Sequence, residues 1–163
     1  MEHEQTLHTV NFPKFGEFTY NAADVVRFPW GLPGFAHARE FIVISLEEQP
    51  HFVWLQSVDD PAVALPMVDP WSLFPEYDPR LPQYAVMSLE IERPESFAVF
   101  CVTVVTKDAA QMTVNLRAPI VINIESRTGR QVPLDGTDYS MRAPVPRTAD
   151  ADLEAEPSQA LSS

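Results

Sequence analysis

Cysteine and glycine are both scarce in this sequence of 163 residues. Cys101 is the single cysteine, so an intrachain disulfide is excluded, and this usage fits a reducing compartment. The five glycines are scattered, and the sequence contains no glycine-rich phosphate loop, no His-Glu-x-x-His pair and no Gly-x-Ser-x-Gly elbow. A thiolate zinc site would need more than one cysteine. The sequence therefore predicts no catalytic residues, no metal site and no cofactor.

Basic side chains are also few. Lysine and arginine number 11 against 23 aspartates and glutamates, which gives a formal charge of −12. A field of this sign repels phosphate backbones and anionic membranes and speeds encounter with basic partners. The plainer alternative is that the acidity only aids solubility. The sequence shows neither a basic, apolar leader after Met1 nor an apolar run near the ~20 residues that span a bilayer. We therefore expect a cytoplasmic protein that binds neither nucleic acid nor membrane directly.

Proline, in contrast, is abundant, with 16 residues spread along the chain. Because proline fixes φ and removes a hydrogen-bond donor, this distribution predicts many short elements and few long helices. Short runs rich in β-branched and aromatic residues, separated by turn residues, predict strands. The predicted strands cover residues 7–12, 17–20, 41–46, 51–57, 87–91, 97–106, 112–116, 120–124 and 130–134. Short helical turns are expected at 36–40 and within 71–84.

The strongest predicted strand covers residues 97–106. Both of its faces are largely apolar, so we expect it to be central and buried on both sides. The pattern as a whole predicts an all-β fold, a small antiparallel β-barrel or sandwich with short helical turns. One domain is expected over residues 1–145. Further on, large apolar residues are few and acidic residues accumulate, so residues 146–163 are predicted to form a disordered acidic C-terminal tail.

Few side chains suggest chemistry. The histidines are spaced as surface or strand-end residues and not as a metal cluster; they are His3, His8, His37 and His51. Cys101 lies within the most apolar strand, where burial raises the pKa of a thiol and makes it inert. Asp59 and Asp60 could form a carboxylate pair, but adjacent residues of an extended chain point to opposite faces, and Asp-Pro is common in turns. We favour the turn.

Aromatic residues near a turn offer a different kind of candidate. Trp30 and Phe35 flank the turn formed by Pro33 and Gly34. An exposed aromatic residue at that place would suit a protein interface. The alternative is that both rings fold under the turn and cover the core.

Several segments carry a family resemblance, three of them as longer elements. Residues 28–35 (FPWGLPGF) resemble the F-x-x-G-[IL]-P-G-F element of the FliW family of flagellar assembly factors. Residues 54–61 (WLQSVDDP) and 115–123 (NLRAPIVIN) are similar to its LQS-x-x-x-P and NL-x-APIVIN elements and follow in the family's order. Residues 129–132 and 139–142 resemble its closing segment. Each element is modest alone, but together they are specific.

The resemblance implies a small antiparallel β-barrel-like fold and a cytoplasmic regulator that is not an enzyme. It also implies two protein partners. One is flagellin, which the protein would bind as a chaperone-like partner. The other is the carbon storage regulator CsrA, a small dimeric RNA-binding protein that represses flagellin translation. Binding of CsrA would relieve the repression, free flagellin would compete for the same protein, and we expect a monomer when both partners are absent.

The candidate partner-binding residues lie in turns and at strand ends. They are Gln56, Asp59, Asp60, Asp69, Asn115 and Asn123. The two asparagines have an alternative role, which is to satisfy backbone groups at the strand ends. The resemblance leaves open which surface meets which partner, and whether CsrA is blocked at its RNA-binding surface or from the side.

Two other classes of function stay open at this point. A hydrolase or a small-ligand-binding barrel would need an open pocket with convergent polar groups such as His51, Asp59 or Asp69. A plain structural subunit would have no regulatory role, and its loss would leave flagellin levels normal.

Overall fold

Short strands dominate the computed structural model, which describes residues 6–108 and 111–146. The helical elements are η1 (Ala22–Asp24), α1 (Pro70–Leu73), α2 (Gln83–Ser88) and η2 (Pro94–Ser96). The strands are β1 (Leu7–Phe12), β2 (Gly16–Asn21), β3 (Val26–Arg27), β4 (Glu40–Ser45), β5 (Val53–Ser57), β6 (Ala64–Val68), β7 (Phe97–Val104), β8 (Thr113–Val114), β9 (Ile120–Asn123), β10 (Thr128–Gln131) and β11 (Ala143–Pro144). The predicted acidic tail falls almost wholly on residues 147–163, which lie outside the described residues.

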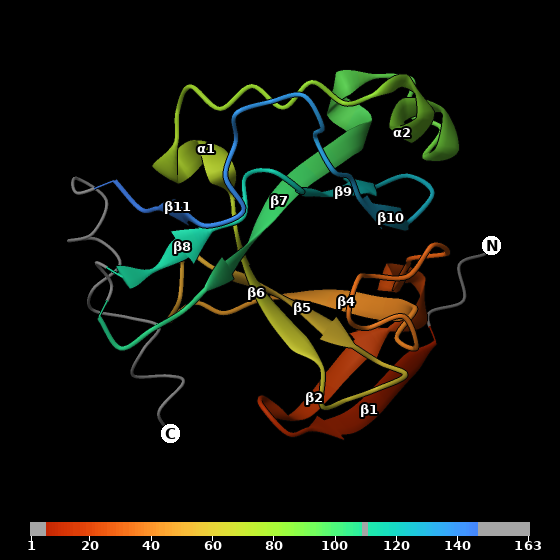
Figure 1. The fold of residues 1–163 in the computed structure, drawn as a ribbon. Helices are drawn as coiled ribbons and strands as arrows, with labels where there is room; N and C mark the ends of the chain where they lie inside the picture. The colour runs from red at the N-terminus through yellow and green to blue at the C-terminus, as the bar shows by residue number, and fades with distance from the viewer. Residues whose placement is uncertain (1–5, 109–110, 147–163) are drawn as a thin grey trace.

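Seven of the strands close into a barrel. Their order is β7-β6-β5-β4-β3-β10-β9, and the pairing of β9 with β7 completes the ring (Figure 1). The barrel-like, mainly antiparallel fold predicted from the sequence is therefore confirmed. One pairing differs, because β3 and β10 run parallel and meet at a single registered pair, Arg27 with Thr128. Strands β8 and β11 extend the sheet outside the ring, along the second half of β7.

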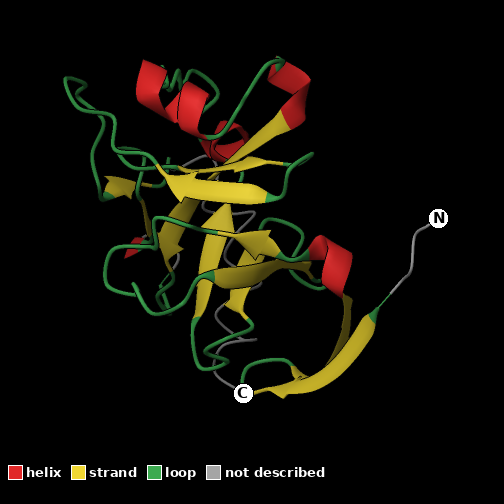
Figure 2. Cartoon of the chain, turned by 90° about the vertical axis from the view of Figure 1, so that its right-hand side faces the viewer, coloured by secondary structure: helices red, strands yellow, loops and turns green. Residues whose placement is uncertain are grey.

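Apolar side chains form three layers. The barrel interior is filled by residues that include Val26, Phe28, Phe41, Leu55, Met67, Ile120 and Ile122. On one outer face the β1–β2 hairpin covers β4 and β5, and Phe12 packs there with Ile42, Ile44 and Trp54. On another outer face, the segment with α1 and α2 covers β7 and β9. Figures 1 and 2 show the hairpin and the two helices on opposite sides of the barrel.

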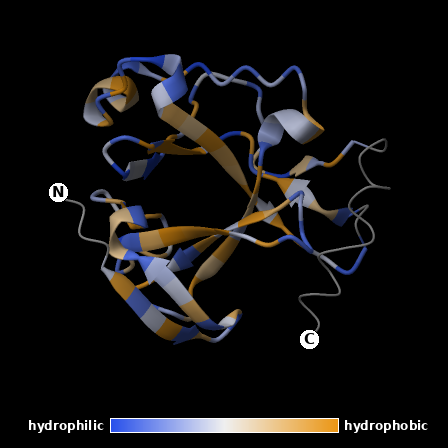
Figure 3. Cartoon of the chain, turned by 180° about the vertical axis from the view of Figure 1, so that it is seen from behind, coloured by the Kyte–Doolittle hydropathy of each residue, from blue (hydrophilic) through white to orange (hydrophobic). Residues whose placement is uncertain are grey.

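The hydropathy of the strands follows this layering. In Figure 3 the hydrophobic residues run along the barrel strands, whereas the hairpin alternates between hydrophobic and hydrophilic positions. On β7, Val99 and Cys101 are buried under the helical segment, while Phe100 and Val102 turn toward the barrel interior and are half-buried. The prediction of full burial on both faces was thus too strong, and the strand ends at Val104, which is exposed.

Two other predictions about secondary structure were wrong. The strand predicted at 87–91 is instead the end of α2, followed by Glu90 with a positive φ of 55°. The apolar spacing there suits a helix equally well, because Ala85 and Leu89 lie four residues apart and bury the same helical face. The segment 36–40 forms hydrogen-bonded turns, such as Ala38 N–H to Phe35 O, and no helix. None of the helices in residues 6–108 and 111–146 has the length and hydropathy of a membrane-spanning segment.

Candidate functional site

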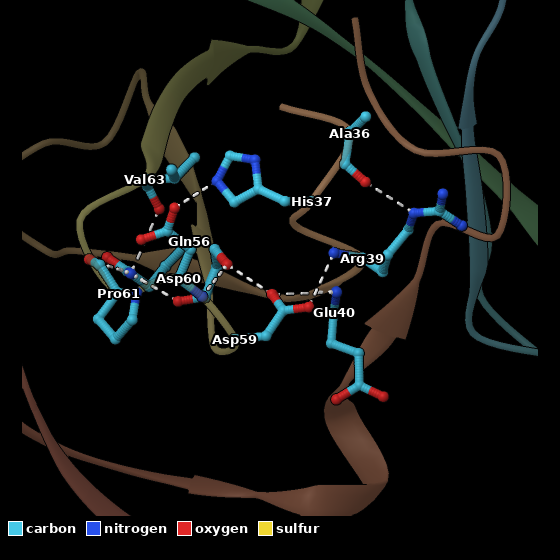
Figure 4. A network of polar contacts seen from close by, with 10 residues as sticks. Ala36, His37, Arg39, Glu40, Gln56, Asp59, Asp60, Pro61 and Val63 are labelled. Atoms are coloured by element: carbon cyan, nitrogen blue, oxygen red, sulfur yellow. Dashed lines mark hydrogen bonds and ion pairs between the residues drawn. The ribbon is translucent and has the colours of Figure 1, made fainter. Parts of the chain in front are cut away.

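The turn between β5 and β6 gathers three of the six candidate residues, Gln56, Asp59 and Asp60 (Figure 4). The Asp59 carboxylate accepts hydrogen bonds from the Arg39 N–H at 2.9 Å and from the Ser57 hydroxyl at 2.8 Å. A longer contact, 3.5 Å, reaches it from the Glu40 N–H. Partial burial alone would raise the pKa of Asp59, but these hydrogen bonds to its charged form outweigh burial and lower the pKa. Asp59 therefore fastens the start of β4 to the β5–β6 turn.

Asp60 points to a different partner. Its backbone N–H donates to the Ser57 hydroxyl at 2.8 Å, and its carboxylate lies 2.5 Å from Nε2 of His37. His37 is exposed, and its side chain comes from the segment before β4 (Figure 4). Because Asp59 and Asp60 bind separate groups, the geometry matches the turn interpretation and does not form a shared carboxylate ligand.

Gln56 holds this turn from beneath. Its side chain is buried, and its amide nitrogen donates to the backbone carbonyls of Ser57 at 2.8 Å and Pro61 at 2.9 Å. The Val63 carbonyl lies 3.3 Å from the same nitrogen. Three surrounding carbonyls fix the orientation of the amide, since only the nitrogen can donate. Its oxygen is buried without a hydrogen-bond partner among the described residues. Gln56 thus shapes the turn and leaves the carboxylates of Asp59 and Asp60 nearer the surface.

Asp69 lies at the opposite end of β6 from that turn. Its Oδ1 accepts a hydrogen bond from the Trp71 N–H at 3.0 Å and so caps α1, with Pro70 at the first helical position. Asp69 and Trp71 also line a groove of about 410 Å³ together with Pro94 and the first residues of β7. Both of their side chains are exposed. Asp69 is therefore a cap residue and a groove residue at once.

The two asparagines hold backbone groups, as the alternative interpretation expected. Asn115 Oδ1 accepts from the N–H groups of Arg117 and Ala118, each at 3.1 Å. Asn123 is buried; its Oδ1 accepts from the Glu125 N–H at 2.9 Å, and its Nδ2 donates to the Leu89 carbonyl at 2.7 Å. Asn123 therefore ties β9 to the end of α2. A role for either asparagine in partner contact stays a prediction.

The polar residues of the hydrolase alternative do not converge. Asp59 follows the end of β5, whereas His51 precedes the start of β5 and Asp69 follows the end of β6. Because β5 and β6 are antiparallel, with Val53 opposite Met67, Asp59 lies at the other end of this strand pair from His51 and Asp69. The barrel interior between them is filled by apolar side chains.

A cluster that sequence reasoning identified only in part joins Trp30, Arg130 and Tyr84. The guanidinium carbon of Arg130 lies 4.4 Å from the centre of the Trp30 ring and 4.8 Å from that of Tyr84. Its Nη1 also donates to the Ser88 hydroxyl at 2.8 Å. The exposed fractions of Trp30 and Tyr84 are 47% and 46%. Tryptophan, tyrosine and arginine are enriched at the energetic centres of protein interfaces, so this cluster is a second candidate binding surface.

Sequence reasoning identified part of this cluster. Trp30 was recognised as a possible exposed anchor beside the turn, and its ring is indeed exposed. Tyr84 is half exposed as well. Arg130 carried no signal, because its contact with Trp30 joins residues 100 positions apart.

Cys101 is buried, as predicted. Its sulfur lies 3.9 Å from the Tyr77 hydroxyl, which itself donates to the Leu116 carbonyl at 2.7 Å. Burial raises the pKa of Cys101 to about 12 and also raises that of Tyr77. Both groups therefore stay neutral at physiological pH. Among the described residues, no three side chains of the metal-ligating types lie close enough to hold an ion.

Comparison with known proteins gives the family. The family model described as FliW protein matches residues 9–145. The chain belongs to the FliW family. The three longer segments that resembled FliW elements form the turn after β3, the strand β5 with its Asp59–Asp60 turn, and the Asn115 turn with β9.

Relatives from several bacteria agree with the FliW assignment. The flagellar assembly factor FliW of Caldicellulosiruptor saccharolyticus is 38% identical over 128 residues, covering 78% of this chain and 84% of that protein. FliW of Thermosipho africanus is 39% identical over 130 residues, covering 79% and 90%. FliW of Moorella thermoacetica is 38% identical over 146 residues, covering 89% and 92%. Each of these relatives is named as a flagellar assembly factor.

The fold is also that of FliW. A crystal structure of the flagellar assembly factor FliW superposes with a TM-score of 0.78 at 34% sequence identity, covering 84% of this chain and 96% of that one. The overall fold is therefore shared with a solved FliW structure.

Proposed function

We propose that this protein is a cytoplasmic flagellar assembly factor that binds flagellin and the translational regulator CsrA in alternation. When flagellin accumulates, it occupies the protein, and CsrA is released to repress flagellin translation. When secretion removes flagellin, the protein binds CsrA again and relieves the repression. A tenfold shift in occupancy needs a difference of only about 1.4 kcal/mol between the two binding free energies.

The observation that carries this proposal is the FliW match over residues 9–145, supported by relatives that are named for flagellar assembly. The identity of the two partners rests on the resemblance of the sequence elements to that family. Partner exchange needs no covalent chemistry.

The charge of the chain supports a basic partner. Residues 1–142 carry 19 acidic and 10 basic side chains, a formal charge of −9, so the acidity does not come from the C-terminal segment alone. An RNA-binding protein such as CsrA presents basic groups to phosphates, and an acidic surface attracts the same groups. The same charge disfavours direct nucleic-acid binding.

Within this proposal the six candidate residues fall into two roles. The carboxylates of Asp59, Asp60 and Asp69 supply negative charge at the two ends of β6. The amides of Gln56, Asn115 and Asn123 hold the loops through backbone hydrogen bonds. We therefore expect the carboxylates to affect partner affinity directly and the amides to act through loop geometry.

The test uses the purified full chain with purified CsrA and flagellin. Light scattering after size exclusion should show a monomer alone and a one-to-one complex with either partner. Calorimetry should give dissociation constants that are micromolar or tighter. Addition of flagellin should displace CsrA from a preformed complex. If the protein forms a complex with neither CsrA nor flagellin, the proposal is contradicted. If all three proteins form one complex, the exchange between partners is contradicted.

A translation assay distinguishes the proposal from a plain structural role. A strain that lacks this protein should make less flagellin while CsrA is present, and normal flagellin levels would favour the structural subunit. A measurement of RNA binding by CsrA within the complex decides whether CsrA is blocked at its RNA-binding surface or from the side. Direct competition predicts that RNA is excluded, and action from the side predicts that CsrA still contacts the protein while RNA is bound weakly.

A further inference from the structure

The first half of β7 has an unpaired edge. One edge of β7 faces β9, and residues Phe97 to Phe100 pair with β9 there. The opposite edge faces β6, where the ladder consists of only two registered pairs, Met67 with Val102 and Val68 with Cys101. Beyond Val68 the chain turns away into α1, so within the described residues no strand pairs with this edge at Phe97–Phe100 (Figure 1).

The hydrogen bond between Asn115 and Val102 shows to which edge of β7 each backbone N–H and C=O group points. The Val102 carbonyl accepts from the Asn115 N–H at 2.9 Å, on the side where β8 and β9 lie. Hydrogen-bonding residues alternate between the two edges of a strand. The N–H and C=O groups of Phe97, Val99 and Cys101 therefore point to the opposite edge, and Cys101 meets β6 there while Phe97 and Val99 do not.

Two prolines explain why β6 stops pairing. In the β6–β7 register, Pro66 would lie opposite Thr103 and Pro70 opposite Val99. Proline has no N–H to donate to either position. The Pro70 carbonyl is also occupied, because it accepts from the Phe74 N–H at 2.7 Å. Residue 70 therefore cannot complete the ladder at Val99.

This edge opens into the groove of about 410 Å³ described above. The groove is lined by Trp71, Pro94 and the residues from Phe97 to Phe100, with Asp69 as the charged residue of the lining. Asp69 Oδ1 caps α1, and Oδ2 has no partner among the described residues. The groove thus combines unpaired main-chain donors and acceptors, an exposed tryptophan and an available carboxylate oxygen.

We propose that the β7 edge at Phe97 and Val99 binds an extended segment of a protein partner that carries a lysine or arginine. An added strand supplies alternating N–H and C=O groups at the required spacing, which is how strand addition gains affinity. The basic side chain of that strand would reach Asp69, and a neighbouring apolar side chain would lie against Trp71. This site does not depend on the identity of either partner proposed above.

Charge argues for this occupant over two others. A second copy of the chain paired at the same edge would bring two Asp69 carboxylates to one strand pair, and like charges there are destabilising. The C-terminal residues 147–163 contain four acidic side chains against Arg147 alone, so they carry the wrong sign for Asp69.

The test is an NMR titration of the ¹⁵N-labelled full chain with a capped synthetic peptide, Thr-Val-Arg-Val-Thr. We expect the amide signals of Phe97 and Val99 to shift saturably and to exchange more slowly with solvent. The same peptide with glutamate in place of arginine should bind less tightly. If the amide signals of Phe97 and Val99 do not shift at millimolar peptide, the site is overturned. If the two peptides bind equally well, the preference for a basic segment is overturned.

Two variants sharpen the test. Asp69→Asn keeps an oxygen that can cap α1 but removes the charge, so the arginine peptide should bind about two- to fivefold more weakly, with the difference lost at high salt. Glu17→Gln, an exposed change on the distant hairpin, should bind the peptide as the unaltered chain does. Equal affinity of Asp69→Asn and Glu17→Gln would overturn the role of Asp69.

The remaining outcomes are also decisive. Shifts of Phe97 and Val99 that grow with protein concentration in the absence of peptide would show a second copy at the edge, and would overturn the partner strand. Because neither CsrA nor flagellin takes part in this titration, their failure to bind would contradict the proposed function while leaving this result intact.

Discussion

Gly129 on β10 faces the ring of Phe28 inside the barrel, and a Cβ atom at position 129 would lie 2.6 Å from Cζ of that ring. Phe28 is fully buried and also meets Phe41 edge-on, with ring centres 5.1 Å apart. The ring therefore has little room to retreat. A glycine at 129 lets β10 approach β3 at the one parallel pairing of the barrel.

Gly129→Ala is accordingly expected to destabilise the protein. Overpacking of a filled core costs about 1–3 kcal/mol in the free energy of unfolding, measurable by urea denaturation. Phe28→Leu should cost stability alone, but its combination with Gly129→Ala should cost less than the sum of the two, because the shorter side chain frees the space. Strict additivity would show that the close approach is not the cause.

Asn115 and Asn123 should respond differently to the same change. Asn115→Asp keeps the oxygen that accepts both of its hydrogen bonds, so we expect a change within about 0.5 kcal/mol. Asn123→Asp loses the N–H group that donates to the Leu89 carbonyl and places a charge in a buried site, which should cost at least about 2 kcal/mol. Thermal unfolding of both variants at neutral pH checks this, and similar losses would contradict the assigned bonds.

Asp59 predicts a pH dependence with a definite sign. Its pKa is lowered in the folded state, so its charged form stabilises the fold above the unfolded pKa of about 3.9, and this contribution is lost as pH falls through the folded value. Asp59→Asn should therefore flatten the fall in Tm below about pH 4. Ser57→Ala, which removes one hydrogen bond to the carboxylate, should flatten it in part. An unchanged acid profile in both variants would refute the assignment.

Cys101 should be unreactive in the folded protein. Burial raises its pKa to about 12, so almost no thiolate forms at pH 8 and the sulfur is shielded from reagents. A chromogenic disulfide reagent should therefore label the native chain slowly and the urea-unfolded chain at once. Fast labelling under native conditions would show that this part of the core opens readily.

Salt should slow the encounter with a basic partner. If the acidic surface steers CsrA, the association rate constant should fall as ionic strength rises while the dissociation rate constant changes little. Stopped-flow mixing at several salt concentrations measures both. Association rates independent of salt would remove steering and leave the acidity as a means of solubility.

Strands could be predicted from the sequence where local composition is decisive. The bounds of β1 match the predicted 7–12, and most other strands were predicted to within about two residues. The strand predicted at 87–91 failed because Met87, Leu89 and Ile91 alternate, yet Ala85 and Leu89 fit a helical period as well. Short apolar runs are ambiguous in this way, and tertiary contacts decide between them.

Closure of the barrel and most site contacts could not be predicted. Closure depends on β7 pairing with β9 through Phe97–Phe100 and with β6 through Cys101 and Val102, and these pairings between distant segments leave no local signal. The turn at Asp59 and Asp60 was evident from the Asp-Asp-Pro sequence, but their contacts with Arg39 and His37 join segments about twenty residues away. The contacts of Arg130 with the rings of Trp30 and Tyr84 join residues still farther apart in the sequence.

The β1–β2 hairpin forms a sheet of its own, separate from the nine-stranded sheet that contains the barrel. It is attached to the barrel through side chains, with Phe12 against Ile42, Ile44 and Trp54. The barrel can keep all of its ladder hydrogen bonds while the hairpin lifts away, so we expect the hairpin to open as a separate unit. Its amides should exchange at a lower opening free energy than those of β5, and each opening would briefly wet the ring of Trp54.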